Sequence, residues 1–338
     1  MSRDAHKTLF HPFEAGAVTP PGADARALFL GAEPGFRLPD GFAASLSLVQ
    51  GFRPYFRSLQ ASGHRVTPVA DGDGYDMALV LVGRHRGQNE RQIAEAIERV
   101  NAGGIVLVGG SKDHGTASLC KRVAKLVELD GMSPKHHGLA FWFRRPLGPD
   151  GLVAALRDGN IGDTIGGRFF AAPGMFSHDR IDAGSRLLVE NLPGDLSGRI
   201  ADFCAGWGYL AAELAARFPG VKALDLYEAD YASVEAARRN LAAASMPIGF
   251  FWQDLEAEAV GERYDAIVMN PPFHQGRAAE PGIGQRLIAV SAKSMRKGGR
   301  LCMVANRQLP YEAILRSEFD RVEEVARDSG FKVLIARR

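Results

Sequence analysis

The alternation of apolar and polar runs along the chain predicts two similar halves. In each half a Tyr-Asp pair opens an apolar run of strand length, at 75–82 and again at 264–269. Apolar residues at helical spacing follow, and a Gly-Gly pair then precedes a second apolar run, at 103–108 and 298–304. We expect the glycines to cap the helices. Strand, helix and strand in this order form a βαβ unit, so the sequence predicts an α/β fold with two doubly wound domains.

The two halves differ where their strands end. After the apolar run, the second half has Asn-Pro-Pro-Phe at 270–273, whereas the first has Gly-Arg-His at 83–85. The opening strand of the first half, 27–30, leads into a loop without a Gly-x-Gly pattern. If the halves arose by duplication, the N-terminal copy has lost its site. Two unrelated α/β units would give the same broad pattern.

The domain boundary is expected in the middle of the chain. The boundary lies between a Pro- and Gly-rich stretch at 146–151 and Pro173. We therefore assign domains to 1–165 and 166–338.

Three strands of the second half end in residues that suit a nucleoside ligand. The strand that carries Asp202 runs into a turn with Gly206 and Gly208, where the backbone can approach a ligand closely. This turn is not Gly-x-Gly-x-x-Gly, which favours a nucleoside over a dinucleotide. Glu228 can accept hydrogen bonds from both ribose hydroxyls, and Asp254 can accept one from an adenine amino group. Taken singly, each has a structural alternative, as a packing glycine, a helix cap or a solvated carboxylate.

Asn270-Pro271-Pro272-Phe273 follow the fourth of these strands. An exocyclic amine on a base is a poor nucleophile, because its lone pair is delocalised into the ring. The side-chain carbonyl of Asn270 and the main-chain carbonyl of Pro271 can each accept one amine hydrogen and so free the lone pair. The prolines hold φ and bring no N–H, and Phe273 offers a flat face to an unstacked base. A plain strand followed by a Pro-Pro turn is the alternative.

The four strand-end features together indicate a ligand site more specifically than any one of them does. In a doubly wound sheet all four strand ends share one edge, where ligands bind. The set predicts a site for S-adenosylmethionine, with Asp202, Gly206, Gly208, Glu228, Asp254 and Asn270 as its cofactor residues. Beside it we expect a pocket that methylates an amine.

Short segments of the second half carry a family resemblance. They are PGMFS at 173–177, DAGS at 182–185, NPPFH at 270–274, VAN and LPY within 304–311, and FKV at 331–333. With these segments the chain resembles the ribosomal RNA guanine-N2 methyltransferases, most closely the small-subunit (16S) enzymes. One departure is Cys204, which stands at the family's first loop glycine and would crowd the methionine end of the cofactor.

The resemblance implies the fold, the activity and the partner. The fold is two tandem Rossmann-like methyltransferase domains, the first degenerate and the second binding S-adenosylmethionine. We expect the first domain to help engage RNA. The activity is methyl transfer to the N2 amine of a guanine in ribosomal RNA, with the RNA or the small ribosomal subunit as partner. Alternatives are a large-subunit guanine, an adenine N6 amine or a glutamine side chain. A non-enzyme alternative is an RNA-binding assembly factor with a vestigial site.

Composition limits the remaining possibilities. Lys and Arg total 41 and Asp and Glu 39, so a net charge of +2 argues against binding RNA by bulk charge. Basic clusters at 84–86, 135–137, 144–145, 296–297 and 337–338 are candidates for local phosphate contacts. The nine histidines and three cysteines lack metal-ligand spacing, so we expect no metal. With no long apolar run we also expect no membrane span and a cytoplasmic protein. The oligomeric state is open, and a monomer is compatible with the sequence.

Overall fold

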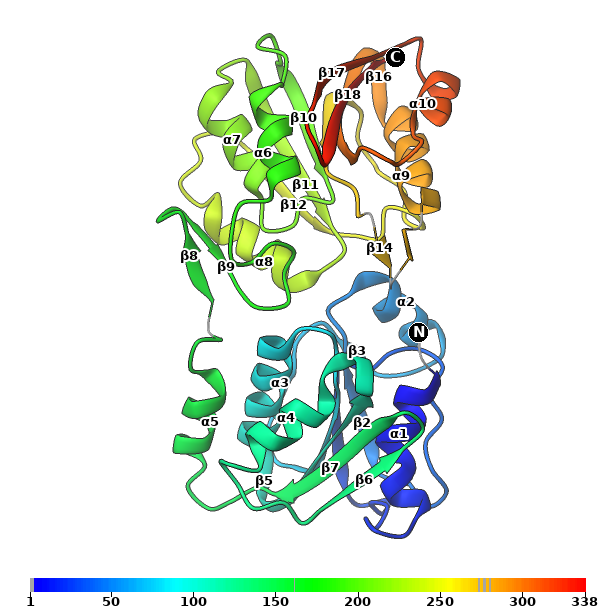
Figure 1. Ribbon diagram of the computed structural model, residues 1–338, viewed down its shortest axis with the longest axis vertical. Coiled ribbons are helices and arrows are strands. Elements are labelled where there is room, and N and C mark those ends of the chain that lie inside the picture. The colour runs from blue at the N-terminus through cyan, green and yellow to red at the C-terminus, as the bar shows by residue number, and fades with distance from the viewer. Residues whose placement is uncertain (1–2, 161, 273, 276–277, 280) are drawn as a thin grey trace. The chain divides into compact units, whose positions relative to one another are not determined.

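The computed structural model describes residues 3–160, 162–272, 274–275, 278–279 and 281–338. The chain divides into two compact units (Figure 1). The first unit comprises 1–162 with 172–174, and the second comprises 163–171 with 175–338. The boundary suggested by the sequence, between 165 and 166, stays a prediction.

The first unit is an α/β sandwich around a seven-stranded sheet. The strand order is β3-β2-β1-β4-β5-β7-β6. The first five of these strands run parallel, and β7 and β6 are antiparallel to their neighbours. The elements are α1 (Arg3–Glu14), β1 (Arg26–Leu30), β2 (Ser45–Val49), α2 (Arg53–Ala61), β3 (Val66–Thr67), β4 (Tyr75–Leu81), α3 (Arg86–Arg99), β5 (Val100–Ser111), the short 3₁₀ helix η1 (Lys112–His114), α4 (Thr116–Val123), β6 (Gly131–Lys135), β7 (Gly138–Arg144) and α5 (Asp150–Arg157).

The second unit repeats this architecture after a small hairpin. Its seven-stranded sheet has the order β12-β11-β10-β13-β16-β18-β17, again with the last two strands antiparallel. The elements are β8 (Asp163–Ile165), β9 (Phe169–Ala171), α6 (Ala183–Glu190), β10 (Gly198–Phe203), α7 (Tyr209–Arg217), β11 (Val221–Glu228), α8 (Tyr231–Asn240), β12 (Ile248–Trp252), β13 (Tyr264–Met269), β14 (His274–Gln275), β15 (Ala278–Ala279), α9 (Pro281–Lys293), β16 (Met295–Asn306), α10 (Glu312–Glu318), β17 (Arg321–Arg327) and β18 (Phe331–Arg337).

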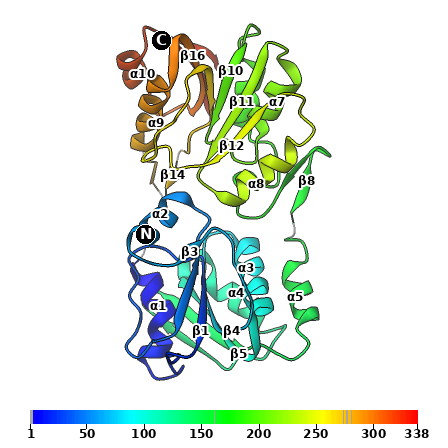
Figure 2. The same ribbon diagram turned by 180° about the vertical axis from the view of Figure 1, so that it is seen from behind.

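The two sheets have the same strand order when each is numbered from its own first strand. Helices cover both faces of each sheet; in the second unit α6 and α7 lie on one face and α9 and α10 on the other (Figures 1 and 2). The prediction of two tandem doubly wound, Rossmann-like domains is therefore confirmed.

The Gly-Gly pairs have a different role from the one predicted. They do not cap helices, because α3 ends at Arg99 and α9 at Lys293, and both pairs lie inside the following strands. Gly103 and Gly298 have φ of 79° and 81°, in the left-handed region that favours glycine. The neighbouring strands β4 and β13 shift register beside them. The pairs therefore permit bulges near the start of β5 and β16.

A buried polar network ties the middle of the second sheet together. The Arg199 side chain on β10 donates to Asp225 Oδ2 on β11 at 2.8 Å. The Tyr264 hydroxyl on β13 donates to the same oxygen at 2.9 Å and lies 2.7 Å from the Tyr227 hydroxyl. Because its carboxylate is occupied in this way, Asp225 is a structural residue of the sheet interior.

Candidate active site

Four polar residues gather at one edge of the second sheet. Asp202 and Glu228 lie at the carboxyl ends of β10 and β11, and Asp254 and Asn270 follow β12 and β13. These four strands are parallel neighbours in the order β12-β11-β10-β13, so their carboxyl ends meet at the same edge. The predicted shared edge is confirmed.

The loop after β10, residues 204–208 (the glycine loop), is hydrogen-bonded to Glu228 at this edge. The Gly206 amide donates to Glu228 Oε2 at 2.8 Å, and the Asp230 amide donates to Oε1 at 2.9 Å. Each carboxylate oxygen can still accept a further hydrogen bond. Burial raises the pKa of the Glu228 carboxyl above its ordinary value. Gly206 has a φ of 54° and open space where a Cβ would stand, so a ligand can approach the backbone here.

Gly208 serves packing. Its φ is 87°, and an added Cβ would stand 3.0 Å from Leu241 Cδ1 and 3.1 Å from Ala237 Cβ. The glycine therefore lets the start of α7 approach α8 closely.

Asp202 holds the start of α7. Its side chain is fully buried, and Oδ2 accepts a hydrogen bond from the Ala211 amide at 3.0 Å. Within the described part of the chain, Oδ1 has no hydrogen-bond partner. Burial, with the nearby Glu228 carboxylate, raises the pKa of Asp202 well above its ordinary value.

Cys204 occupies a backbone position that suits glycine. Its φ is 60°, in the left-handed region, and its side chain lines the hollow described below. Burial raises the pKa of its thiol well above the ordinary value, and the Glu228 and Asp202 carboxylates add to the shift. Cys204 therefore stays a neutral thiol at physiological pH.

Asn270 presents an unpaired oxygen. Its side-chain Nδ2 donates to Asp182 Oδ2 at 3.0 Å and to Ser185 Oγ at 2.7 Å. Among the described residues nothing bonds its Oδ1, although this atom is buried. Pro271 after it is buried and Pro272 is exposed, whereas Phe273 lies outside the described residues.

A small hollow opens at Asn270. It is lined by Asn270, Asp182 and Ser185 together with Cys204, Ala205 and Gly206 of the glycine loop. Phe176, Trp207 and further side chains complete the lining. Glycine backbone and a residue with an unpaired acceptor in the same lining suit a nucleoside cofactor beside an amine donor.

Sequence reasoning missed Phe176 as a site residue. The side chain is 58% exposed although it lies in the lining of the hollow. Its carbonyl accepts a hydrogen bond from Trp207 Nε1 at 2.9 Å, which ties Phe176 to the glycine loop. An aromatic residue inside a segment already singled out was the available signal.

Asp254 organises the turn after β12. Its Oδ1 accepts from the Glu256 amide at 3.1 Å, and its own amide donates to Glu258 Oε2 at 2.8 Å. It lies on the predicted edge and outside the lining of the hollow, as do Asp202, Gly208 and Glu228.

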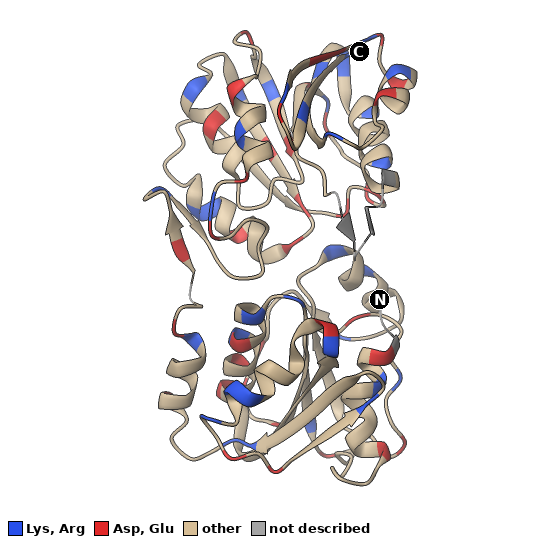
Figure 3. Cartoon of the chain, in the orientation of Figure 1, with Lys and Arg blue, Asp and Glu red and all other residues tan. Residues whose placement is uncertain are grey.

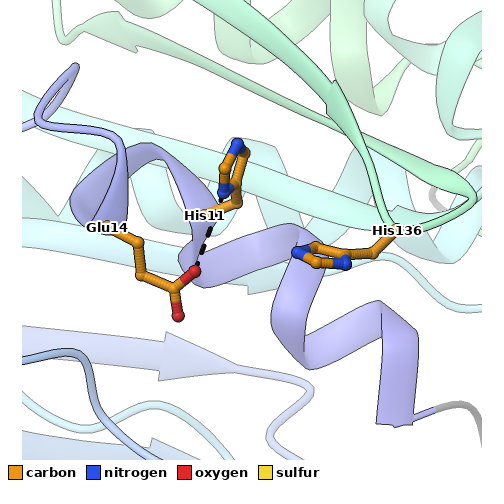
Figure 4. Close-up of side chains that lie close together, drawn as sticks. All are labelled: His11, Glu14 and His136. Carbon is orange, nitrogen blue, oxygen red and sulfur yellow. Dashed lines mark ion pairs between the residues drawn. The ribbon is translucent and has the colours of Figure 1, made fainter.

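A separate group of titratable side chains lies in the first unit. His11 and Glu14 of α1 point toward His136 of the β6–β7 turn (Figure 4). Their possible ligand atoms lie within 4.8 Å of one another, with His11 Nδ1 and Glu14 Oε2 at 3.7 Å. The group shares no residue with the hollow at Asn270. None of the helices among the described residues is long and apolar enough to cross a membrane.

The strand order and the polar strand edge are those of a Rossmann-like methyltransferase. A family model described as methyltransferase small domain matches residues 166–335, and the chain belongs to this family.

The chain is also similar to individual proteins. Ribosomal RNA small subunit methyltransferase C of Salmonella newport (strain SL254) is 38% identical over 161 residues, which are 48% of this chain and 46% of that relative. The protein of the same name from Klebsiella pneumoniae matches to the same extent. The chain thus spans about half the length of these relatives.

One solved structure aligns with nearly the whole chain. It is described as a T. thermophilus 16S rRNA N2 G1207 methyltransferase in complex with AdoMet and guanosine. The TM-score is 0.78 at 26% identity, over 99% of this chain and 91% of that one. The tandem architecture is therefore common to both proteins.

Proposed function

We propose that this protein transfers a methyl group from S-adenosylmethionine to the exocyclic N2 amine of a guanine in ribosomal RNA, within the 16S RNA of the small subunit. Three lines support the proposal. Its relatives are named as small-subunit ribosomal RNA methyltransferases, the fold matches a 16S rRNA N2 methyltransferase solved with AdoMet and guanosine, and the Asn270 hollow lies beside the glycine loop.

The cofactor is held along the strand edge. Asp202, Gly206, Gly208, Glu228, Asp254 and Asn270 are the proposed cofactor residues. When bound, S-adenosylmethionine supplies a sulfonium methyl group that is already activated for transfer. The free lone pairs of Glu228 accept the ribose hydroxyls, and the Gly206 backbone allows close approach. Asp202 acts indirectly, because its buried carboxyl holds the start of α7 behind the glycine loop.

The chemistry of the protein is alignment and hydrogen-bond acceptance. Asn270 Oδ1 and the Pro271 carbonyl each accept one hydrogen of the guanine amine, which localises the nitrogen lone pair. Pro272 stiffens the turn and Phe273 stacks on the base. Placing the amine in line with the methyl group supplies most of the acceleration, so no general base is needed.

One observation carries the proposal: Asn270 Oδ1 is a buried acceptor without a partner among the described residues. A buried acceptor that lacks a bond is costly, so its natural occupant is a donor brought by a ligand. An amine with two hydrogens fits this acceptor together with the Pro271 carbonyl.

The test is methyl transfer by an Asn270→Ala variant. Wild-type protein is incubated with labelled S-adenosylmethionine and undermodified small subunits, large subunits or naked RNA, and the modified base is mapped. We expect label on an N2 amine of 16S guanine. Asn270→Ala should lower kcat at least about 100-fold, because one preorganised contact to the reacting group is lost, while RNA binding is largely retained.

Asn191→Ala is the matched control. This residue ends α6, and its side chain donates only to the Leu187 carbonyl among the bonds described for it. The Asn191→Ala variant should transfer the methyl group at the wild-type rate. Normal turnover by Asn270→Ala would contradict the assignment of the motif. Label on adenine or glutamine would favour those acceptors, and cofactor binding without transfer would favour an assembly factor.

We further propose that the first domain, 1–165, is a degenerate copy that engages RNA, and that the protein acts in the cytoplasm. Its counterpart of the Asn270 segment is Gly83-Arg84-His85, which offers cations and no Asn-Pro-Pro turn. All three cysteines are free, in keeping with a reducing compartment.

A further inference from the structure

We infer that Asp182 and Ser185 are positioning residues that set the orientation of the Asn270 amide, so that its oxygen and never its nitrogen faces the reacting amine. The inference rests on the proposed function of Asn270. It assigns a task to the 182–185 segment, whose Asp182 and Ser185 side chains accept hydrogen bonds from the Asn270 amide.

An amide side chain can be reversed by a half-turn, which exchanges its oxygen and nitrogen. In Asn270 the nitrogen donates to two acceptors, Asp182 Oδ2 at 3.0 Å and Ser185 Oγ at 2.7 Å. An ionised carboxylate accepts and cannot donate. In the reversed amide, Asn270 Oδ1 would face this carboxylate oxygen, so two acceptors would meet. The carboxylate therefore excludes the reversed amide.

The amide oxygen is left for another partner. Both hydrogens of Nδ2 are used on the α6 side, so only Oδ1 is left to interact elsewhere. This oxygen is buried and has no partner within the described residues. A substrate that offers N–H is accepted there, whereas one that offers a carbonyl is repelled.

The two acceptors are themselves held rigidly. Asp182 caps α6, because Oδ2 also accepts the Ser185 amide at 2.8 Å. The helix start is pressed against the sheet, since an added Cβ on Gly184 would stand 3.0 Å from the Phe331 ring. The 182–185 and 331–333 segments, far apart in the chain, thus lie together, and the first turn of α6 is a fixed support for the amide.

The chain contains a matched helix start without this function. Helix α8 begins with Asp230 three residues before Ser233, just as α6 has Asp182 before Ser185. There the Ser233 hydroxyl donates to Asp230 Oδ1 at 2.8 Å. Both serines are buried, at 3% and 7% exposure. Ser233 is therefore a control for loss of a buried hydroxyl at the same helical position.

The experiment compares Ser185→Ala and Asp182→Ser with Ser233→Ala in the full chain. Serine still caps a helix but is too short to reach Asn270. We expect kcat to fall roughly 10- to 100-fold in both test variants, as for loss of an orienting partner behind a reacting group. Melting temperature and KM for RNA should stay near wild type. Ser233→Ala should keep the wild-type kcat.

Two readouts separate orientation from a merely structural role. Asp182→Asn can place its amide oxygen at the Oδ2 position, accept both bonds and recover most of kcat. Inosine lacks the amine and cannot be methylated, so the second readout is a binding preference, the ratio of the dissociation constants of inosine and guanosine. It should shrink towards one in Ser185→Ala and persist in Ser233→Ala. Wild-type kcat and preference in both test variants would overturn the inference.

The proposed function and the inference can fail separately. If wild-type protein does not methylate guanine, the proposed function fails. The inference then stands or falls on the Asn270 side-chain amide protons, observed by NMR. They should exchange slowly in wild-type protein and in Ser233→Ala, and faster in Ser185→Ala. Equal exchange in all three proteins would overturn the inference.

Discussion

At the scale of single residues, Cys204 of the glycine loop has a backbone conformation that favours glycine. Cys204 has a φ of 60°, and a left-handed backbone costs a residue with a Cβ about 1–2 kcal/mol. The strain is confined to a loop between β10 and α7 that the surrounding sheet and helix hold in place. The position therefore tolerates cysteine at a cost to stability.

This strain predicts an inverted order of two substitutions. In most folded positions alanine is more stable than glycine, because glycine loses more backbone entropy on folding. At Cys204 we expect Cys204→Gly to exceed Cys204→Ala in free energy of unfolding by about 1 kcal/mol. Urea titration of the two variants measures the difference. A higher free energy of unfolding for Cys204→Ala than for Cys204→Gly would show that the loop is not strained in solution.

At the scale of elements, β10 and α7 are joined by a buried carboxyl. Asp202 Oδ2 accepts the Ala211 amide in the first turn of α7, and burial raises its pKa well above the ordinary 3.8. The folded protein therefore keeps this proton to a higher pH than the unfolded chain does. Its contribution to stability falls as pH rises from about 3.8 through the raised pKa.

Asp202→Asn should remove this dependence, because asparagine keeps the acceptor for Ala211 and has no charge. We expect the variant to gain stability relative to wild type as pH rises, by about 1.4 kcal/mol for each unit of the pKa shift. Chemical denaturation at pH 5 and pH 8 measures the gain. Asp195→Asn is the control without a pH-dependent difference, because a hydrogen bond from Arg300 lowers the Asp195 pKa and so places its titration below this pH range. If the difference in free energy of unfolding between wild type and Asp202→Asn were the same at pH 5 and pH 8, the explanation would be contradicted.

At the scale of the whole molecule, charge is dispersed. Cationic and anionic side chains are interspersed along the elements of both units (Figure 3), and the net charge is +2. RNA affinity must then come from local features. In the first unit a hollow of about 430 Å³ at the β6–β7 turn is lined by Pro134 and Leu139 and edged by Lys112 and Lys135. Apolar walls with cations at the rim suit an unpaired nucleotide.

If the first domain engages RNA here, Lys112→Ala and Lys135→Ala should each weaken binding and reduce the salt-dependence slope by about one. Cofactor affinity, which depends on the second unit, should not change. Binding titrations at several salt concentrations give both quantities. Lys125→Ala, exposed in the same unit outside this hollow, is the control. Unchanged slopes in both test variants would place RNA contacts elsewhere.

The central strands and the residues at their ends could be predicted from the local sequence pattern. Apolar runs predicted β4, β10 and β13 nearly to the residue, because a central strand buries both faces. Sheet topology then brought Asp202, Glu228, Asp254 and Asn270 to one edge, since parallel strands share their carboxyl ends. The Gly-Gly pairs were misread, because helix caps and strand bulges both need glycine at positive φ.

The sequence by itself determined which chemical groups stand at the strand ends and that each half forms a doubly wound α/β sheet. Only the tertiary structure decided which way the Asn270 amide faces, because its partners Asp182 and Ser185 lie more than eighty residues earlier in the chain. It likewise brought Phe176 to the hollow. Periodicity reports burial and local backbone preference, whereas contacts between distant side chains depend on how helices pack on the sheet.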